Sequence, residues 1–281
     1  MPLRLPLLLA VLQAAAAAAA GPTPPLEVLL ARAGARAAAL EEELAVVTAT
    51  EEHDQRLYLG RDEKRRRIVS DVVWVPTGDA MVWAFFRDIL EVDGAPVADR
   101  AHRLEGLFAQ GATADARRRA AAMQQEGARF NLGTLRTVDA PNLGLAVLHP
   151  RNRARFAFER EKRERKHGVD AVRIGFRETA SPALTRTSAG RDIPAHGTLW
   201  IEPATGALVA SALRLDVPGL PTEIDVRFGR DDRLQAWLPL EMTQGYGQRS
   251  SFRRSERVEA TARYSGFRRA GTEVEIIFPK R

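Results

Sequence analysis

The chain has 281 residues, of which 45% are hydrophobic and 28% charged, and its formal net charge is +6. This balance is typical of a soluble globular protein and excludes a disordered or membrane-spanning chain. The absence of cysteine excludes disulfides, thiolate metal sites, cysteine nucleophiles and a lipid-modified N-terminal cysteine. The surplus of arginine favours anionic neighbours, among them a peripheral contact with an anionic membrane surface.

The first 20 residues have the pattern of a secretory signal. Arg4 precedes a short apolar run over residues 5–12, and an alanine run follows, with small residues at Ala18 and Ala20. The apolar run is too short to favour a permanent membrane anchor, which is the alternative. The pattern predicts a signal peptide over residues 1–20, a single domain over residues 21–281 and export to the periplasm.

The next segments predict a helix followed by two strands. Apolar residues recur at three- and four-residue steps over residues 26–47, which predicts a long amphipathic helix. The charged run 61–67 is interpreted as a solvated turn. Residues 68–75 are rich in β-branched side chains, and residues 81–92 return after the turn 76–79, so they predict a β-hairpin.

A helical insert is predicted over about residues 98–148. Residues 98–109 and 113–130 have helical composition. The segment 143–148, Leu-Gly-Leu-Ala-Val-Leu, is short, entirely apolar and bracketed by two prolines. We expect it to be a small helix that fills a hollow.

From residue 154 onward the sequence predicts strands in series. The clearest hairpin runs from Gly197 to Asp216 around a Pro-Ala-Thr-Gly turn. Further strands alternate apolar with polar residues, the apolar ones being Val172, Ile174 and Phe176, then Ile224, Val226 and Phe228, then Val258, Ala260, Ala262 and Tyr264. Pro239 argues for an edge strand or a bulge.

These elements define the expected fold class, α+β. A large antiparallel sheet with one apolar face twists and curls. We expect an unclosed half β-barrel whose concave face is covered by the long N-terminal helix and the inserted helices. The candidate ligand-binding residues, as an apolar wall or lid, are Trp83, Phe85, Phe86, Leu145, Leu148 and Trp200. Their alternative interpretation is ordinary core.

The sequence contains no pattern for metal or cofactor chemistry. The five histidines stand singly, without the spacing of a zinc site, and neither a nucleophile elbow nor a phosphate-binding loop occurs. We therefore expect no metal, no cofactor and no enzymatic activity. The basic segment 151–167 is interrupted by glutamates, so a solvated strand is favoured over a polyanion-binding surface, and no nucleic-acid partner is expected.

The order of elements resembles the periplasmic LolA/LolB-type lipoprotein-carrier fold. The resemblance rests on a signal, a long first helix, a strand pair, inserted helices and successive strands that include the segment Gly197–Gly206. The segments 237–242 and 262–269 also resemble exported proteins of acidobacteria. The resemblance implies an unclosed barrel with a helical lid, whose apolar concavity holds acyl chains. It also implies a lid-holding arginine on an early strand, for which residues 65–67 are candidates without an assigned role.

The expected function is that of a periplasmic binding or carrier protein for an acyl chain, a lipid or a lipoprotein, acting as a monomer. On this hypothesis an entering lipid displaces the segment 143–148. The alternative is a non-enzymatic structural or interaction module of the cell envelope with a filled interior. A hydrolase with an unfamiliar site is a third hypothesis.

Overall fold

The computed structural model describes residues 23–43, 46–79, 81–100, 103–109, 111–133, 141–187, 189–217, 220–248 and 256–269. The helices are α1 (Leu26–Glu43), α2 (Arg103–Phe108), α3 (Ala114–Gly127) and α4 (Leu143–Leu148), with 3-10 turns η1 (Ala128–Phe130) and η2 (Pro150–Arg155). The strands are β1 (Val47–Leu59), β2 (Asp62–Pro76), β3 (Trp83–Val92), β4 (Ala95–Pro96), β5 (Phe156–Lys166), β6 (Val169–Glu178), β7 (Thr185–Arg186), β8 (Asp192–Ile193), β9 (Ala195–Ile201), β10 (Leu208–Val217), β11 (Leu220–Asp231), β12 (Ala236–Gln248) and β13 (Glu256–Arg269). The predicted signal, residues 1–20, lies outside the described residues.

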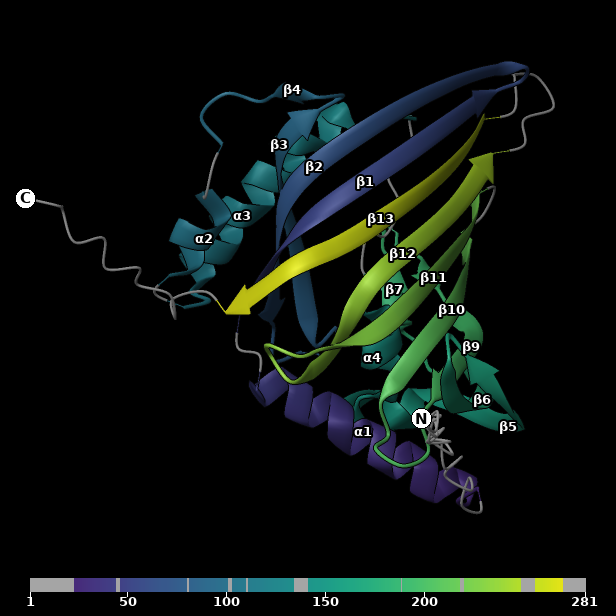
Figure 1. Cartoon of the computed structure of the whole chain (residues 1–281). Helices are drawn as coiled ribbons and strands as arrows, with labels where there is room; N and C mark the ends of the chain where they lie inside the picture. Colours follow the sequence, from purple (N-terminus) through teal and green to yellow (C-terminus); the bar gives the residue numbers. More distant parts are fainter. Residues whose placement is uncertain are drawn as a thin grey trace, which may run out of the picture.

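The strands form one large antiparallel sheet that does not close. Its 11 strands follow the order β4-β3-β2-β1-β13-β12-β11-β10-β9-β6-β5, and β7 pairs with β8 in a separate sheet. The strand pair β1–β13 places the first described strand beside the last. The sheet curls around α4, while α1 crosses beneath its lower end (Figure 1). The expected α+β half-barrel is confirmed.

The predicted alternation sets which face of each strand is buried. In β11, Ile224, Val226 and Phe228 are buried, whereas the residues between them are more exposed. The hairpin expected over residues 197–216 is present as β9 and β10. Pro239 lies at a register shift between β11 and β12, so the predicted bulge is confirmed within a central strand.

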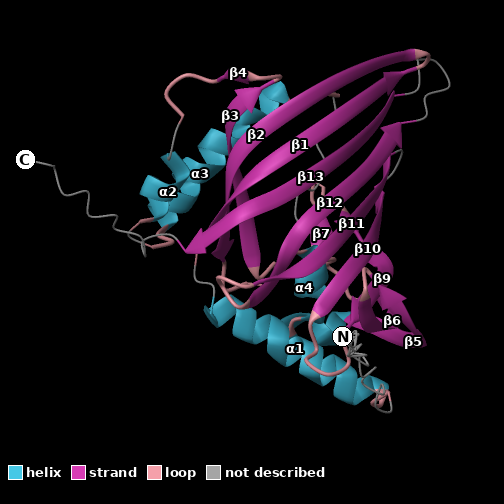
Figure 2. Ribbon diagram, viewed as in Figure 1, coloured by secondary structure: helices cyan, strands magenta, loops and turns pink. Residues whose placement is uncertain are grey.

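The inserted helices divide between the two faces of the sheet (Figure 2). Helix α4 lies in the hollow with α1, where both contribute to the main apolar core. Helices α2 and α3 instead pack on the opposite face of β2 and β3, against Val73, Val75 and Phe86. The reason is that both faces of β2 and β3 carry large apolar side chains at this end, so each face needs a cover.

The helix expected over residues 26–47 ends at Glu43, and other expected elements also differ from the structure. Residues 61–67, expected as a turn, mostly belong to β2, which begins at Asp62. Strand β1 was not expected, and the first inserted helix, α2, is shorter than the predicted range 98–109. The charged residues of β2 remain exposed at the end of a long hairpin, which explains why their composition resembles that of a turn.

The turn of the β9–β10 hairpin anchors α1 to the sheet. Gly206 has a φ of 78°, and a Cβ atom at this position would lie 2.8 Å from the backbone of Arg32. The Arg32 guanidinium also donates to the carbonyl of Pro203. Glycine is therefore needed for both the turn and the close approach of the helix.

Candidate functional site

The hollow of the sheet is lined by apolar side chains from most of its strands. Those with the lowest exposure include Val72, Ile174, Leu199, Ile201, Leu213, Leu215, Ile224 and Met242. Because side chains alternate along each strand, one parity of every strand supplies this lining. The hollow is thus a continuous apolar surface that has to be covered by another apolar group.

Helix α4 supplies that cover, and all six of its residues are buried. It packs against α1, β10 and η2. At Gly144 a Cβ atom would lie 2.8 Å from the Cβ of Ser211 on β10. Only glycine permits this distance, so the helix backbone sits close against the strand. A helix of six residues is too short to be stable alone, and its conformation depends on this packing.

Helix α1 closes the hollow from outside α4. Its buried face includes Leu29, Leu30, Ala37 and Leu40. A Cβ atom at Gly34 would lie 3.1 Å from the carbonyl oxygen of Leu148, the last residue of α4. Small residues on α1 thus allow the two helices to lie in direct contact.

Two asparagine side chains hold the ends of α4. The Nδ2 of Asn142 donates to the carbonyl oxygen of Trp83, at 3.3 Å. The Nδ2 of Asn152 donates to the carbonyl oxygen of Ala146 inside the helix, at 2.8 Å. Both asparagines are 1% exposed. Within the apolar hollow these contacts fix the position of α4 without a covalent or charged link.

A histidine follows α4 directly and lies against α1. His149 is 4% exposed, and its Nε2 lies 3.2 Å from a carboxylate oxygen of Glu41. Its Nδ1 accepts a hydrogen bond from the backbone N–H of Arg151, at 3.3 Å. Burial, with a smaller contribution from the charge of Arg151, lowers the pKa of His149 despite the nearby Glu41. The imidazole is therefore neutral at pH 7.

The inner face also holds one buried ion pair. Arg87 on β3 donates from Nη2 to Oε1 of Glu51 on β1, at 2.7 Å, and a second hydrogen bond runs from its Nε. The side chains are 6% and 0% exposed. The guanidinium also lies 5.6 Å from the ring centroid of Phe85. This pair places two opposed charges at the side of the hollow, on the face of β1 that also carries His53 and Gln55.

Four of the six predicted wall or lid residues lie around the hollow. Trp83, Phe85, Leu145 and Leu148 belong to the core cluster that contains α4. The other two do not line it. Phe86 stacks on Phe108 beneath α2 and α3. Trp200 lies on the outer face, where its Nε1 donates to Glu164.

Two further aromatic residues of the hollow, Trp74 and Phe267, were not expected, whereas Tyr264 was predicted on the apolar face of its strand. Trp74 contacts Phe85, Tyr264 and Phe267, with ring centroids 5.3, 5.4 and 5.8 Å apart. Phe85 belongs to β3, and Tyr264 and Phe267 both belong to β13. Tyr264 alternates with polar residues, which is why its face could be predicted, whereas Trp74 stands between Val73 and Val75, so no alternation assigns it to a face.

Neither a three-ligand metal cluster nor a helix fit to span a membrane occurs among the described residues. No group of three His, Asp or Glu side chains among them is arranged to hold a metal ion. None of the described helices has the length and apolar content needed to cross a membrane. The hollow buries an apolar helix, and the buried amides of Asn142 and Asn152 hold that helix in place.

Comparisons with known proteins give two structural neighbours. No family model matches the chain, and no curated protein matches it. An outer membrane lipoprotein-sorting protein domain from Vibrio parahaemolyticus is similar at a TM-score of 0.41 and 10% identity, over 88% of this chain and 94% of that domain. A DUF1329 family protein from Desulfovibrio piger is similar at a TM-score of 0.38 and 9% identity, over 90% and 96%.

The first of these neighbours is of the lipoprotein-sorting type that the sequence resemblance names. TM-scores below 0.5 at about 10% identity do not carry a function from one chain to another. The function of this protein therefore has to be inferred from its own residues.

Proposed function

We propose that the protein is an exported, non-enzymatic carrier that binds an acyl chain, of a lipid or a lipoprotein, in the hollow of its sheet. The observation that carries the proposal is α4, a six-residue helix of Leu, Gly, Ala and Val, fully buried against the apolar face. Its side chains are chemically equivalent to the hydrocarbon that would replace them. The described structure is then the closed, unloaded form.

The cost of displacing α4 is partly offset by the ligand. Removing α4 exposes apolar surface on both the helix and the sheet, at a cost of about 25 cal/mol per Å². An acyl chain that enters the hollow restores the sheet side of that burial. Since α4 is fixed by packing and by the amides of Asn142 and Asn152, it can leave as a unit without breaking an ion pair of its own.

Three further assignments belong to this proposal. Residues 1–20 direct export to the periplasm and are removed, leaving residues 21–281 as one domain. Trp83, Phe85, Leu145 and Leu148 form the wall and the lid of the ligand site. Acyl-chain binding agrees with what the resemblance to LolA/LolB-type carriers implies.

The test compares lipid uptake in matched variants. The protein is titrated with a dansyl-labelled fatty acid, and uptake is followed by fluorescence. Leu145→Asp and Leu148→Asp each place a charge where α4 packs and so weaken the closed form. Burying an unpaired carboxylate costs well over ~1.4 kcal/mol, so the affinity for the fatty acid should change by about tenfold or more. Val28→Asp, at a position 46% exposed on α1, is the control and leaves uptake unchanged.

Native mass spectrometry of the exported protein provides the second readout. We expect bound lipid to co-purify with it. If no lipid co-purifies and neither fatty acids nor phospholipids are taken up, the hollow is permanently filled by α4. The protein is then the structural or interaction module of the envelope that the sequence left as the alternative.

A further inference from the structure

Beyond the apolar lining around α4, the inner face of the sheet carries buried polar side chains. Strand β1 places Glu51, His53 and Gln55 on this face, and β12 places Gln244 there. None of the four residues is more than 5% exposed. The hollow therefore has two parts, an apolar part that α4 fills and a polar part along β1, β13 and β12.

Two glutamines lie at the centre of the polar part. In register, Gln55 on β1 and Gln244 on β12 stand in one row on either side of Ala260 on β13. Two strand spacings separate them, which is about 9.6 Å. Because the side chain between them is only a methyl group, a planar polar group that lies over Ala260 can hydrogen-bond to both amides, each at an N···O distance of about 2.9 Å.

In the closed form, the segment that follows η1 satisfies the first of these amides. The Oε1 of Gln55 accepts a hydrogen bond from the backbone N–H of Leu132, at 2.7 Å, and its Nε2 donates to Oδ1 of Asn131, at 2.8 Å. Gly133 lies so close to β13 that a Cβ atom there would be 2.8 Å from Oε1 of Glu256. Gln55 thus has one donor and one amide oxygen as its partners, both from the chain itself.

This segment matches the polar part of the hollow as α4 matches the apolar part. Helix α4 presents hydrocarbon side chains to an apolar surface. The segment after η1 presents one N–H and one amide oxygen to a buried amide. A ligand that replaces both has to combine a hydrocarbon chain with a polar group that donates and accepts hydrogen bonds, because a buried amide without partners is costly.

One hydroxyl in the polar part makes no hydrogen bond to the described residues. Ser70 on β2 is the cross-strand neighbour of Glu51 and is 0% exposed, and its Oγ has no partner there. A buried hydroxyl without a partner loses its hydration and gains nothing in exchange. The polar part therefore has hydrogen-bonding capacity that the closed form does not use.

The charges around the polar part favour an uncharged ligand group. Those on the inner face of β1, β2, β3 and β13 near this site are Glu51, Asp62, Lys64, Arg66, Arg87 and Glu256. Glu51 and Arg87 neutralise each other, and Arg66 pairs with Asp93 at 3.2 Å. Asp62, Lys64 and Glu256 lie near strand ends, where water reaches them. An ionised group between the two glutamines would be buried without a counter-charge of its own, which is costly.

We propose that the polar part of the hollow binds the uncharged polar group of an amphiphile, between Gln55 and Gln244, with its hydrocarbon chain in the place of α4. The group donates and accepts a hydrogen bond, as the amide of an N-acyl compound or the hydroxyl and ester of a monoacylglycerol does. This inference rests on the carrier function proposed above and names the class of molecule that the carrier selects. The two glutamines are its specificity-determining residues.

The test compares two ligands that differ in one donor. N-methyldecanamide and methyl decanoate have the same chain and nearly the same shape, but only the amide has an N–H. Each displaces a dansyl-labelled fatty acid from the protein, and displacement is followed by fluorescence. We expect the amide to bind at least fivefold tighter, because the ester leaves a buried acceptor without a donor. A purely apolar site favours the ester instead, since the ester loses less hydration.

A third ligand, 1-decanoylglycerol, separates the two sources of the polar group. Its hydroxyls replace the N–H of the amide, so it should also bind more tightly than methyl decanoate. Whichever of the amide and the glycerol ester binds more tightly identifies the linkage that the site prefers. If neither exceeds methyl decanoate, the proposal is wrong.

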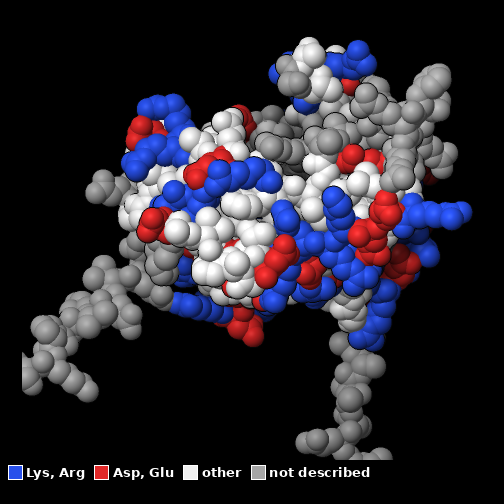
Figure 3. Space-filling view, turned by 90° about the horizontal axis from the view of Figure 1, so that it is seen from above, with Lys and Arg blue, Asp and Glu red and all other residues white. Residues whose placement is uncertain are grey.

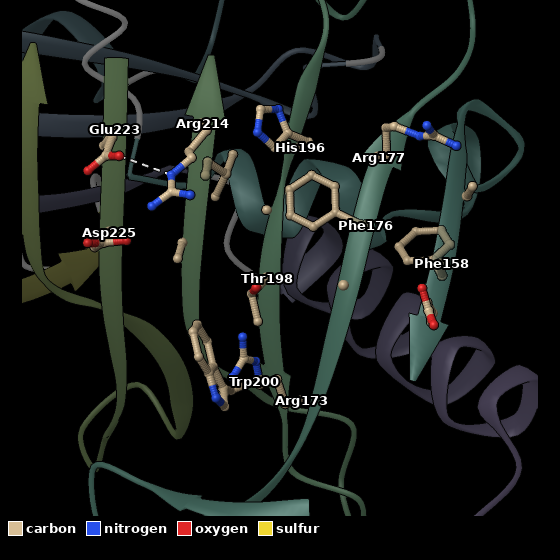
Figure 4. Close-up of a pocket in the computed structure, with 16 residues that line it drawn as sticks. Phe158, Arg173, Phe176, Arg177, His196, Thr198, Trp200, Arg214, Glu223 and Asp225 are labelled. Atoms are coloured by element: carbon tan, nitrogen blue, oxygen red, sulfur yellow. Dashed lines mark hydrogen bonds and ion pairs between the residues drawn. The ribbon is translucent and has the colours of Figure 1, made fainter. Parts of the chain in front are cut away.

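The ratio of the amide and ester affinities separates recognition from the cost of opening, because both ligands displace the same segments. Gln55→Leu should lower this ratio at least fivefold while the ester binds as well as before or better, since the segment after η1 is then held less tightly. Gln244→Leu should lower the ratio in the same direction. Thr198→Val, on the outer face of β9 (Figure 4), is the control and leaves the ratio unchanged.

The outcomes distinguish this inference from the carrier function. If the dansyl probe binds but the ratio is the same in the native protein and both glutamine variants, the hollow takes up acyl chains without reading their polar group, and only this inference fails. If neither the probe nor any of the three decanoyl ligands binds, the carrier function fails and this inference fails with it.

Discussion

The two faces of this sheet use the same two-residue period for opposite purposes. The inner face is apolar and is filled by α4 and α1, whereas the outer face of the same strands carries arginines and acids in mixed order. Figure 3 shows the mixture from above, where Lys and Arg lie beside Asp and Glu rather than in a patch of one sign. Away from the part of β2 and β3 that α2 and α3 cover, inner residues are held by burial and outer residues form mostly solvated pairs.

This difference has a measurable consequence. An inner substitution removes buried area or leaves a buried charge unpaired, and both change the free energy of unfolding by kilocalories per mole. An outer substitution exchanges one solvated group for another and changes it by a few tenths. The predictions below compare matched substitutions on the two faces.

The largest effect is expected at the ion pair inside the hollow. Glu51→Ala removes the carboxylate that pairs with the buried guanidinium of Arg87 and should lower the free energy of unfolding by about 3–5 kcal/mol. The double variant Glu51→Leu, Arg87→Met should recover most of this loss, because no charge remains buried. Urea denaturation measures both values.

An exposed ion pair between β1 and its neighbour β2 provides the control. Arg67 and Glu52 lie 2.9 Å apart, with side chains 53% and 48% exposed. Glu52→Ala should cost less than about 1 kcal/mol. Similar losses for Glu51→Ala and Glu52→Ala would contradict the distinction between the two faces.

The second effect concerns the packing of α4. Leu145→Ala leaves a cavity in the hollow and should lower the free energy of unfolding by about 2–5 kcal/mol. Val28→Ala on the exposed side of α1 should change it by less than about 0.5 kcal/mol. Chemical denaturation is again the measurement, and a loss below 1 kcal/mol for Leu145→Ala would mean that α4 is not packed as described.

The sequence predicts the later strands well because their signal is local. The strands from β5 onward alternate apolar and polar residues, and such alternation depends on no distant partner. Strand β1 carries Glu51, His53 and Gln55 on its buried parity, so polar residues occupy both faces and the alternation is hidden. Only the partner Arg87, 36 residues away, explains a carboxylate that is 0% exposed.

The candidate site could be predicted in part for a similar reason. Helix α4 is recognisable from its composition and its flanking prolines. Phe86 and Trp200 lie in short runs that are apolar on both parities, so the sequence cannot assign either residue to a face. The assignment depends on where α2 and α3 dock and on the contact of Trp200 with Glu164. Predicting which residues are neighbours on the outer face, such as Arg214 and Glu223, requires the strand register, and no local pattern in the sequence contains it.

A smaller effect is expected from pH at the junction of α4 and α1. Burial lowers the pKa of His149 below the unfolded value of about 6.5, so the unfolded chain binds a proton before the folded chain does. Stability is therefore lost as pH falls below about 6.5, by at most ~1.4 kcal/mol per pH unit. His149→Gln should lack this component, and denaturation at pH 7.5 and 5.5 measures the difference. Parallel losses in both proteins would assign the pH effect to other groups.

The smallest effect is expected at Arg214 and Glu223, cross-strand neighbours on the outer face of β10 and β11. Their side chains are 64% and 59% exposed, so water screens the pair and side-chain entropy offsets much of the attraction. A double-mutant cycle with Arg214→Ala and Glu223→Ala should give a coupling energy below about 1 kcal/mol that decreases further at 1 M salt. A coupling energy above about 2 kcal/mol would show that this part of the outer face is desolvated. That result would contradict the proposed difference between the two faces.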